Sequence, residues 1–359
     1  MNTVLLLPVL FASDGGIQRI LRLYVRAVGE LTPLPGQVHT LVLNDTAGQL
    51  TTGCLRPYAT PALTAPIGCG RNKLACAWHM IRLGRLSQRV ICGHINLLRV
   101  AHLARLFSRG LEVWLVAHGL EVWRKFSVSE QRALCATHRI LCVSDYTRGQ
   151  LLENCPGLSR AQLVIQPNAL DPAFERTLST HAPSVPGLIL SVARLNAAES
   201  YKGIDHLIAA MPAIRSAIPH ARLRVVGDGD DRARLEALAT ASAANDAIEF
   251  TGRVSDETLY THFEAAHLFA LPSRGEGFGL VYLEAMAHGK PCLVADAGGA
   301  PEVISAASGV LANYGDVRDI AGVAIAALRR DWSSESIRAR ARKFTYPAFK
   351  ARMSTLLMS

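Results

Sequence analysis

Short apolar runs alternate with longer stretches of helical periodicity along almost the whole chain, and this alternation restricts the fold more than any other feature. Runs such as T-V-L-L-L-P-V-L, E-V-W-L-V-A-H and R-I-L-C-V-S are β-rich and end in polar or turn residues. The stretches I-Q-R-I-L-R-L-Y-V-R-A-V and N-L-L-R-V-A-H-L-A-R-L-F carry apolar residues at helical spacing. Nearly continuous apolar strands with helices between them predict an α/β fold, in which doubly wound parallel sheets are covered on both faces.

A break in the alternation predicts two domains. T-H-A-P-S-V-P-G, residues 180–187, contains two prolines and a glycine and is typical of a linker. We therefore expect an N-terminal Rossmann-like domain over residues 1–179 and a second such domain that starts at residue 188. Ligands of doubly wound sheets bind outside the carboxyl ends of the strands, so the expected site is a cleft between two facing sheets.

The positive charge of the chain is concentrated in its N-terminal half. Residues 1–180 contain 19 Lys and Arg against 10 Asp and Glu, whereas the remainder contains 19 of each, so the net charge of +9 arises before residue 181. Much of the excess lies between Arg71 and Arg109. We expect this half to face an anionic partner, namely a lipid surface, an acceptor with a pyrophosphate group, or nucleic acid. A solvated, arginine-rich helix surface is the alternative.

Cysteine usage and hydropathy indicate a cytoplasmic protein. The eight cysteines are scattered in mostly apolar settings, with no C-x-x-C pair and no cluster at zinc spacing, so we expect no metal site. No apolar run approaches the ~20 residues of a membrane span. The first residues lack the charged start of a signal peptide and predict a buried strand.

The stretch S-R-G-E-G-F-G-L-V-Y-L-E-A-M-A-H-G-K-P, residues 273–291, joins a predicted strand to a predicted helix through a glycine-rich turn. Gly275, Gly277 and Gly279 allow close approach of the backbone to a ligand, and the helix N-terminus beside them attracts phosphate. Glu276 lies in the turn, and we expect Glu284 about two turns into the helix, within reach of the same pocket. The alternative is that Glu276 is an ordinary turn residue and Glu284 a solvated residue on the helix surface. The apolar surroundings of Glu284 disfavour this alternative, because an unpaired buried charge is costly.

Two cations follow the first strand of the second domain. Arg194 ends L-I-L-S-V-A-R, and Lys202 precedes Gly203 at the start of the next helix. Two cations at the carboxyl edge of one sheet are suited to holding a diphosphate, although each alone would usually be an ordinary surface residue.

Three weaker signals complete the set of candidates. Gly15-Gly16 offers backbone N–H groups at the start of the first helix. G-D-G-D-D-R, residues 227–232, superficially resembles a metal-binding D-x-D, but we expect a turn with an aspartate cap. His94 and His118 both end strands, and His118 is the better candidate because Gly119 follows it at the expected edge of the cleft. No Ser-His-Asp arrangement, Walker loop, H-E-x-x-H or RNA-binding signature is present.

These motifs together resemble the retaining, nucleotide-sugar-dependent glycosyltransferases of the GT-B fold, the glycosyl transferases group 1 or family 4 type, whose bacterial members build polysaccharides and lipopolysaccharides. E-G-F-G-L-x-x-L-E-A-M-A-x-G-x-P is the most specific motif of that group. The resemblance covers nearly the whole chain and is strongest from Val192 to Ile304. It implies a second domain over 188–340 and a C-terminal helix, 341–359, that returns to the N-terminal domain.

The resemblance also implies roles for individual residues. Arg194 and Lys202 would bind the donor diphosphate, His118 would contact the transferred sugar, and Glu284 would bind the nucleotide ribose. Glu276 and the backbone after it would hold the donor sugar. The remaining implied donor-site residues are Gly15, Gly16, Arg253, Val254, Gly277, Phe278, Gly279 and Leu280. Asp296–Glu302 would form a neighbouring loop. The chain departs from the group in its long loop between Arg194 and Lys202 and in P-N-A-L-D, where P-N-G-V-D is common.

The resemblance implies a retaining hexosyltransferase that uses a nucleotide-diphosphate sugar and no metal or other cofactor. GDP-mannose is the first expectation for the donor, and UDP-linked sugars are the second. The acceptor would be lipid-linked or a glycan, held by the N-terminal domain at the inner face of the cytoplasmic membrane, and no nucleic acid would be bound. We expect the membrane contact in region 71–109, through Arg82, Arg85 and Arg89. A GT-B-type epimerase and a non-catalytic sugar-nucleotide-binding protein are the rivals.

Overall fold

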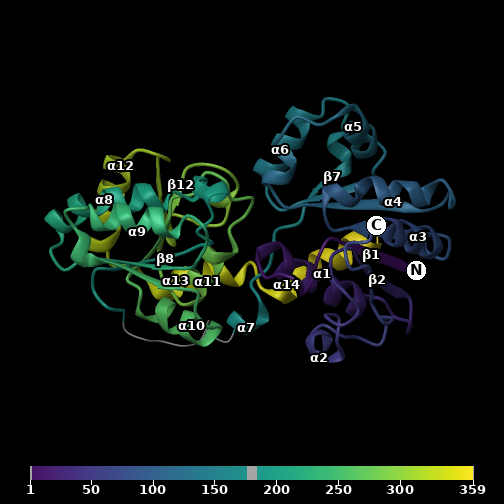
Figure 1. Ribbon diagram of the computed structural model, residues 1–359, viewed down its shortest axis with the longest axis horizontal. Helices are drawn as coiled ribbons and strands as arrows, with labels where there is room; N and C mark the ends of the chain where they lie inside the picture. The colour runs from purple at the N-terminus through teal and green to yellow at the C-terminus, as the bar shows by residue number, and fades with distance from the viewer. Residues whose placement is uncertain (1, 176–183, 359) are drawn as a thin grey trace. The chain divides into compact units, whose positions relative to one another are not determined.

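The computed structural model describes residues 2–175 and 184–358, which form two compact units (Figure 1). Unit 1 comprises Met1–Asp171 with Tyr346–Ser359, and unit 2 comprises Pro172–Thr345. Of the predicted linker, residues 180–183 lie outside the described residues. The prediction of two α/β domains is confirmed.

Among the described residues of unit 1, seven parallel strands form one sheet in the order β3-β2-β1-β4-β5-β6-β7. The strands are β1 (Thr3–Leu7), β2 (Val38–Val42), β3 (Ile67–Gly68), β4 (Arg89–Cys92), β5 (Glu112–Ala117), β6 (Arg139–Cys142) and β7 (Leu163–Ile165). The chain builds outward in opposite directions from β1, so the boundary between β1 and β4 is the switch point at which such sheets bind ligands.

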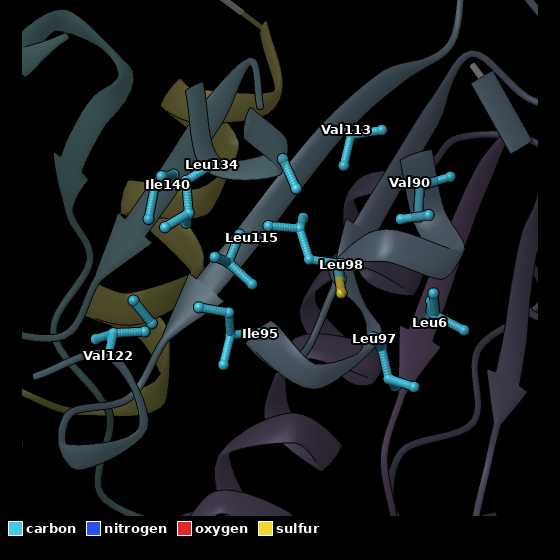
Figure 2. Packing of buried hydrophobic residues seen from close by; sticks show 14 of the residues in the cluster. Leu6, Val90, Ile95, Leu97, Leu98, Val113, Leu115, Val122, Leu134 and Ile140 are labelled. Carbon is cyan, nitrogen blue, oxygen red and sulfur yellow. The ribbon is translucent and has the colours of Figure 1, made fainter. Parts of the chain in front are cut away.

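Helices cover both faces of this sheet. They are α1 (Gly16–Leu31), α2 (Thr52–Leu55), α3 (Lys73–Gly84), α4 (Leu98–Arg105), α5 (Val128–Cys135), α6 (Asp145–Asn154) and α14 (Tyr346–Met358). Figure 2 shows the core on one face, where Leu98 of α4 lies among strand residues that include Val90, Val113 and Leu115. Every residue of β1 is buried, as expected for a parallel strand covered on both sides.

Unit 2 repeats the architecture with a six-stranded parallel sheet in its described part, ordered β10-β9-β8-β11-β12-β13. Its strands are β8 (Leu188–Val192), β9 (Arg222–Val226), β10 (Ile248–Gly252), β11 (Leu268–Leu271), β12 (Cys292–Ala295) and β13 (Gly309–Ala312). Its helices are α7 (Pro172–Glu175), α8 (Ile204–Ala217), α9 (Arg232–Thr240), α10 (Asp256–Ala265), α11 (Leu280–Ala287), α12 (Val317–Arg329) and α13 (Ser334–Arg342). The switch point here lies between β8 and β11.

The first unit ends earlier than the predicted domain boundary at residue 179. Residues 172–175 belong to unit 2, because Phe174 of α7 packs edge-on against Tyr260 of α10 with ring centroids 4.7 Å apart. This aromatic contact joins residues far apart in the chain, so no local pattern reveals it.

The predicted C-terminal segment, residues 341–359, is divided between the two units. Residues 341–345 belong to unit 2, where Phe344 packs edge-on against Phe278 with ring centroids 5.4 Å apart. The helix that belongs to unit 1 is α14, which starts at Tyr346.

Helix α14 lies beside α1 in unit 1 (Figure 1). Phe349 meets Tyr24 edge-on with ring centroids 5.0 Å apart, and both side chains are fully buried. Glu30 of α1 accepts hydrogen bonds from the Tyr346 hydroxyl at 3.0 Å and from Lys350 Nζ at 2.8 Å. The last helix of the chain is therefore part of the core of unit 1.

Candidate functional site

The carboxyl edge of the unit 2 sheet collects the residues that the sequence predicted for the donor. Arg194 follows β8, Glu276 follows the neighbouring β11, and Arg253 follows β10. The loop after β12 joins them, because Gly299 N–H donates to the carbonyl oxygen of Glu276 at 2.8 Å. Parallel strands thus bring these segments to one edge of the sheet, where Arg194 and Glu276 follow β8 and β11, the two strands that flank the switch point.

Arg194 and Lys202 are linked through a carboxylate that the sequence analysis did not single out. Glu199 lies in the loop between them, within the 3-10 helix Ala197–Lys202. Its Oε1 is 2.8 Å from Arg194 Nη2, and its Oε2 is 2.9 Å from Lys202 Nζ. The side chains of Glu199 and Lys202 are largely buried, whereas the side chain of Arg194 is 62% exposed. The loop therefore holds one anion between two cations.

Close backbone packing determines the position of this loop. Gly227 has φ 141° after β9, and a Cβ atom there would overlap the carbonyl oxygen of Ala193. Ala193 N–H donates to the Val226 carbonyl oxygen at 3.0 Å, and Leu195 N–H donates to that of Asp228 at 3.0 Å. The glycine of G-D-G-D-D-R thus allows the loop that carries Arg194 to lie directly on the end of β9.

The predicted aspartate cap in that segment was wrong in its chemistry. Helix α9 begins at Arg232 as expected, but the Asp231 side chain makes no capping hydrogen bond. Instead its two carboxylate oxygens accept from Nε and Nη2 of Arg234, both at 2.7 Å, and Arg234 holds the pKa of Asp231 below its usual range. A two-pronged ion pair satisfies this carboxylate better than a single N–H does.

The glycine-rich turn after β11 packs against the same loop. A Cβ atom at Gly275 would overlap the Tyr201 ring, and Arg274 N–H donates to the Tyr201 carbonyl oxygen at 3.1 Å. Burial and the nearby carboxylates of Glu199 and Glu276 raise the pKa of Tyr201 to about 12, whereas Arg194 opposes the shift. Tyr201 therefore lies close to the charged groups of both segments, Arg194 and Glu199 in its own loop and Glu276 in the turn after β11.

The turn leaves backbone donors at the N-terminus of α11. In the described part of the chain, no hydrogen-bond acceptor meets the N–H groups of Gly277, Phe278 or Gly279. Gly279 has φ 89°, which ends the turn and starts the helix at Leu280. Three unused N–H groups at a helix start are suited to an anionic or hydroxyl-rich ligand.

Two of the predicted donor residues, Phe278 and Glu284, are buried. Phe278 is buried against Phe344, so its backbone rather than its side chain is available to a ligand. Because α11 starts at Leu280, Glu284 is little more than one turn into the helix, not two. Glu284 is buried, with 7% of the residue exposed, so its carboxylate does not lie in the bulk solvent.

In unit 1, the predicted glycine pair follows β1 at the switch point. Gly16 is the first residue of α1, and Gly15 has φ 170°, an extended conformation open to any residue. The buried Asp45 shapes the loop before them, because its carboxylate accepts from the N–H groups of Leu10, Phe11 and Ala12 at 2.9, 2.7 and 3.0 Å. Asp45 is thus a site-shaping residue that the sequence analysis missed.

His118 and His94 follow the adjacent strands β5 and β4. His118 Nε2 lies 2.9 Å from the Gly93 carbonyl oxygen. A carbonyl oxygen only accepts hydrogen bonds, so Nε2 of His118 carries a proton in this contact. Burial lowers the pKa of His94, and the neighbouring His118 and Arg124 lower it further while Glu121 opposes them. The structure therefore brings the two histidines together at the carboxyl ends of adjacent strands.

Comparison with known proteins identifies the second part of the chain. Residues 179–344 match the family model described as glycosyl transferases group 1. The chain carries a glycosyl transferases group 1 domain. In the described ranges of the whole chain, no three His, Cys, Asp or Glu side chains gather in a way that would hold a metal ion.

Relatives of the chain include two bacterial mannosyltransferases. The GDP-mannose-dependent monoacylated alpha-(1-6)-phosphatidylinositol monomannoside mannosyltransferase of Corynebacterium glutamicum is 40% identical over 123 residues, 32% of each chain. The GDP-mannose-dependent alpha-(1-6)-phosphatidylinositol monomannoside mannosyltransferase of Mycobacterium tuberculosis strain H37Rv is 33% identical over 208 residues, 52% of each chain. The matches thus span between a third and a half of these relatives.

Solved structures match the fold of both units. HepE of Anabaena in complex with UDP has a TM-score of 0.76 at 18% identity, and the match covers 100% of both chains. The apo form of the lipopolysaccharide outer core galactosyltransferase WaaB has a TM-score of 0.75 at 16% identity and covers 100% of this chain and 99% of WaaB. The fold of the chain is therefore GT-B, as the motifs predicted.

The group 1 domain contains the predicted residues from Arg194 onward, together with two that the sequence analysis passed over. Glu199 and Tyr201 lie in the long loop between Arg194 and Lys202, where neither residue type marks a site. The spacing of Glu199 could have been recognised in the sequence, because an acidic side chain three positions before a lysine can contact that lysine on a helical turn. The contact of Tyr201 with Gly275 depends on the strand order and had no such signal.

Proposed function

We propose that this chain is a retaining glycosyltransferase that moves a hexose from a nucleotide-diphosphate sugar to a lipid-linked or glycan acceptor. One observation carries the proposal: Arg194 and Lys202 lie with Glu276 and the unused N–H groups before α11 at the switch point of one sheet. Cations and aligned N–H groups suit the diphosphate, and carboxylates suit the hydroxyls of the ribose and the sugar.

The proposed chemistry follows from where charge develops. As the bond between the anomeric carbon and the phosphate oxygen breaks, its electron pair moves to the departing diphosphate, and the acceptor oxygen bonds to the anomeric carbon on the same face. The acceptor proton passes to a phosphate oxygen. Arg194 and Lys202 would stabilise the charge of the leaving group, a task that this proposal assigns to side chains rather than to a metal ion.

We propose GDP-mannose as the donor. Its support is that the relatives from Corynebacterium and Mycobacterium are described as GDP-mannose-dependent. The structural likeness to HepE, which was solved with UDP, makes UDP-sugars the second candidates. We assign the acceptor to unit 1, where His118 would contact the transferred sugar, and place the reaction in the cytoplasm, at the inner face of the cytoplasmic membrane.

Calorimetric titration with GDP, UDP, dTDP and ADP tests the donor site. We expect GDP to bind best and Glu284→Ala to weaken it by about 10–100-fold, because a charged hydrogen-bond acceptor contributes about 1.5–3 kcal/mol. Glu335→Ala, an exposed residue of α13, is the matched control and should bind as the unaltered protein does. If the folded protein binds none of the four diphosphates, the proposed function is wrong.

Glu199→Gln tests whether the Glu199 carboxylate opposes diphosphate binding by Arg194 and Lys202. The carboxylate competes with the diphosphate for Arg194 and Lys202, and Gln keeps its shape without its charge. We expect GDP to bind about fivefold more tightly, corresponding to about 1 kcal/mol for a partly exposed ion pair. The same titration measures it, with Glu236→Gln on α9 as the control. Weaker binding would show instead that Glu199 is needed to hold Lys202 in position.

A further inference from the structure

Unit 1 exposes several large apolar side chains on α3 and just after α3 and α4. The exposed fractions are 84% for Leu74, 59% for Trp78, 62% for Leu86, 77% for Leu106 and 49% for Phe107. Single exposed apolar residues are common, but a group of this size on adjoining segments marks a contact surface. We call this group, together with Arg82 and Arg85, the α3–α4 face.

The members of the α3–α4 face lie together. Leu74, Trp78 and Arg82 are spaced four apart and lie on one side of α3, and Arg85 follows on the same side. The Arg82 guanidinium lies over the Trp78 ring at 5.3 Å from its centroid. The Arg85 guanidinium lies over the Phe107 ring at 5.2 Å, so the end of α3 and the segment after α4 form one continuous surface.

The segment of the sequence that forms this surface carries only positive charge. The sequence has no Asp or Glu between Asp45 and Glu112, whereas this interval contains Arg56, Arg71, Lys73, Arg82, Arg85, Arg89, Arg99, Arg105 and Arg109. Since Arg82 and Arg85 contact aromatic rings and no carboxylate among the described residues, their charge remains available to a partner.

One of the cations predicted for membrane contact is not on the surface. Arg89 is 5% exposed, lies 3.1 Å from Glu112 and covers the Trp114 ring at 4.2 Å from its centroid. It also donates to the Leu357 carbonyl oxygen of α14 at 3.5 Å. The expectation for Arg89 was wrong, because β4 buries it under the last helix, and it contributes to packing instead.

We propose that the α3–α4 face docks on an anionic lipid bilayer, with Trp78, Leu74 and Phe107 in the headgroup region and Arg82 and Arg85 on lipid phosphates. Basic residues interleaved with Trp, Phe and Leu on a helix face suit the interface between water and acyl chains. Phosphates alone, as in nucleic acid, would use the cations and leave Leu74 and Leu106 in water. None of the helices in the part of the chain that the structure describes could span a bilayer.

This inference gives the proposed lipid-linked acceptor a place of encounter, and it rests on the proposed function for that purpose only. The lipid contact can be measured without donor or acceptor. We therefore propose co-sedimentation of the full chain with vesicles of phosphatidylcholine alone and with about one third phosphatidylglycerol. The protein should bind the anionic vesicles at least about tenfold more tightly than the neutral ones.

Two double variants separate the charge from the apolar contribution. Arg82→Glu with Arg85→Glu should weaken binding to anionic vesicles at least about tenfold. Leu74→Ser with Trp78→Ser should weaken it by a similar factor even at low salt. All four residues are exposed, so circular dichroism melts should stay unchanged.

Two control variants of unit 2 match these changes. Leu238→Ser replaces an apolar residue of α9 that is 41% exposed, and Arg222→Glu with Arg318→Glu reverses two exposed cations. Both should bind vesicles as the unaltered protein does. Equal losses in the controls and the α3–α4 variants would overturn the proposal, since vesicle binding would then not depend on this face.

Trp78 provides a direct readout of insertion. The difference in fluorescence between the unaltered protein and Trp78→Phe should shift to shorter wavelength on adding anionic vesicles, because the exposed ring leaves water. Absence of binding by the unaltered protein would overturn the proposal and point to an acidic protein partner. GDP titration of the same variants separates the two hypotheses: loss of vesicle binding with intact GDP binding concerns the face alone.

Discussion

Lys202→Ala is expected to lower the turnover number for sugar transfer by about 10²–10³-fold, the loss that follows removal of one fixed charge donor from a departing oxyanion. The Lys202 side chain is largely buried, and its Nζ is 2.9 Å from Glu199, so its charge is poorly screened by water. Steady-state kinetics with GDP-mannose and an acceptor would measure the effect. Because the leaving group gains charge in the transition state, the turnover number should fall more than KM rises.

Two comparisons make this result specific. Lys343→Ala removes an exposed lysine of unit 2 and should leave the rate unchanged. Arg194→Ala should cost less than Lys202→Ala, because the Arg194 side chain is 62% exposed and water screens its charge. An unchanged turnover number in Lys202→Ala would remove this lysine from the proposed mechanism.

Gly227→Ala is expected to destabilise unit 2 by about 3 kcal/mol or more. Alanine is strained at the φ of 141° found there, and its Cβ would overlap the Ala193 carbonyl oxygen, so backbone strain and overpacking both contribute. For a unit of this size the melting temperature should fall by about 6–12 °C in differential scanning calorimetry. Arg194 immediately follows Ala193, so GDP binding should weaken as well.

Gly322→Ala is the matched control for this change. Gly322 is an exposed residue of α12, and a Cβ atom there would meet nothing within 4 Å. Alanine should stabilise the helix by about 0.5–1 kcal/mol. If Gly227→Ala had the melting temperature of the unaltered protein, the loop after β8 would move away from the new Cβ atom without loss of stability. The close packing at Gly227 would then not determine the position of Arg194.

The sequence predicted the fold well, because buried parallel strands carry a strong local signal. The quoted apolar runs coincide with β1, β5 and β6 in unit 1 and with β8 in unit 2. The two-residue β3, Ile67–Gly68, gives no such signal and was missed. The boundaries at residues 171 and 345 depend on aromatic contacts distant in sequence, which periodicity cannot report.

Prediction of the site was limited by contacts between loops. The sequence showed that Arg194 and Lys202 follow a strand. The placement of the Glu199 carboxylate between them depends on the conformation of a long loop, which the sequence did not show. In the same way, Arg89 read as a surface cation in a basic segment, although the pairing of β4 with β5 places it beside Glu112. Charge type was visible in the sequence, whereas exposure was decided by packing.

The position of α14 in unit 1 has a consequence for biosynthesis. Phe349 and Met353 are fully buried in a unit whose other residues are 1–171, and the whole of unit 2 is translated between the two parts. A nascent chain that has released residues 1–171 therefore lacks part of its own core until the last helix leaves the ribosome. The residues of unit 2 are contiguous, so all of them are synthesised before α14 completes unit 1. Unit 2 can therefore complete its fold first, whereas N-terminal domains generally fold first during synthesis. While translation continues, Tyr24 and its neighbours on α1 form an uncovered apolar face, which is where a chaperone would bind.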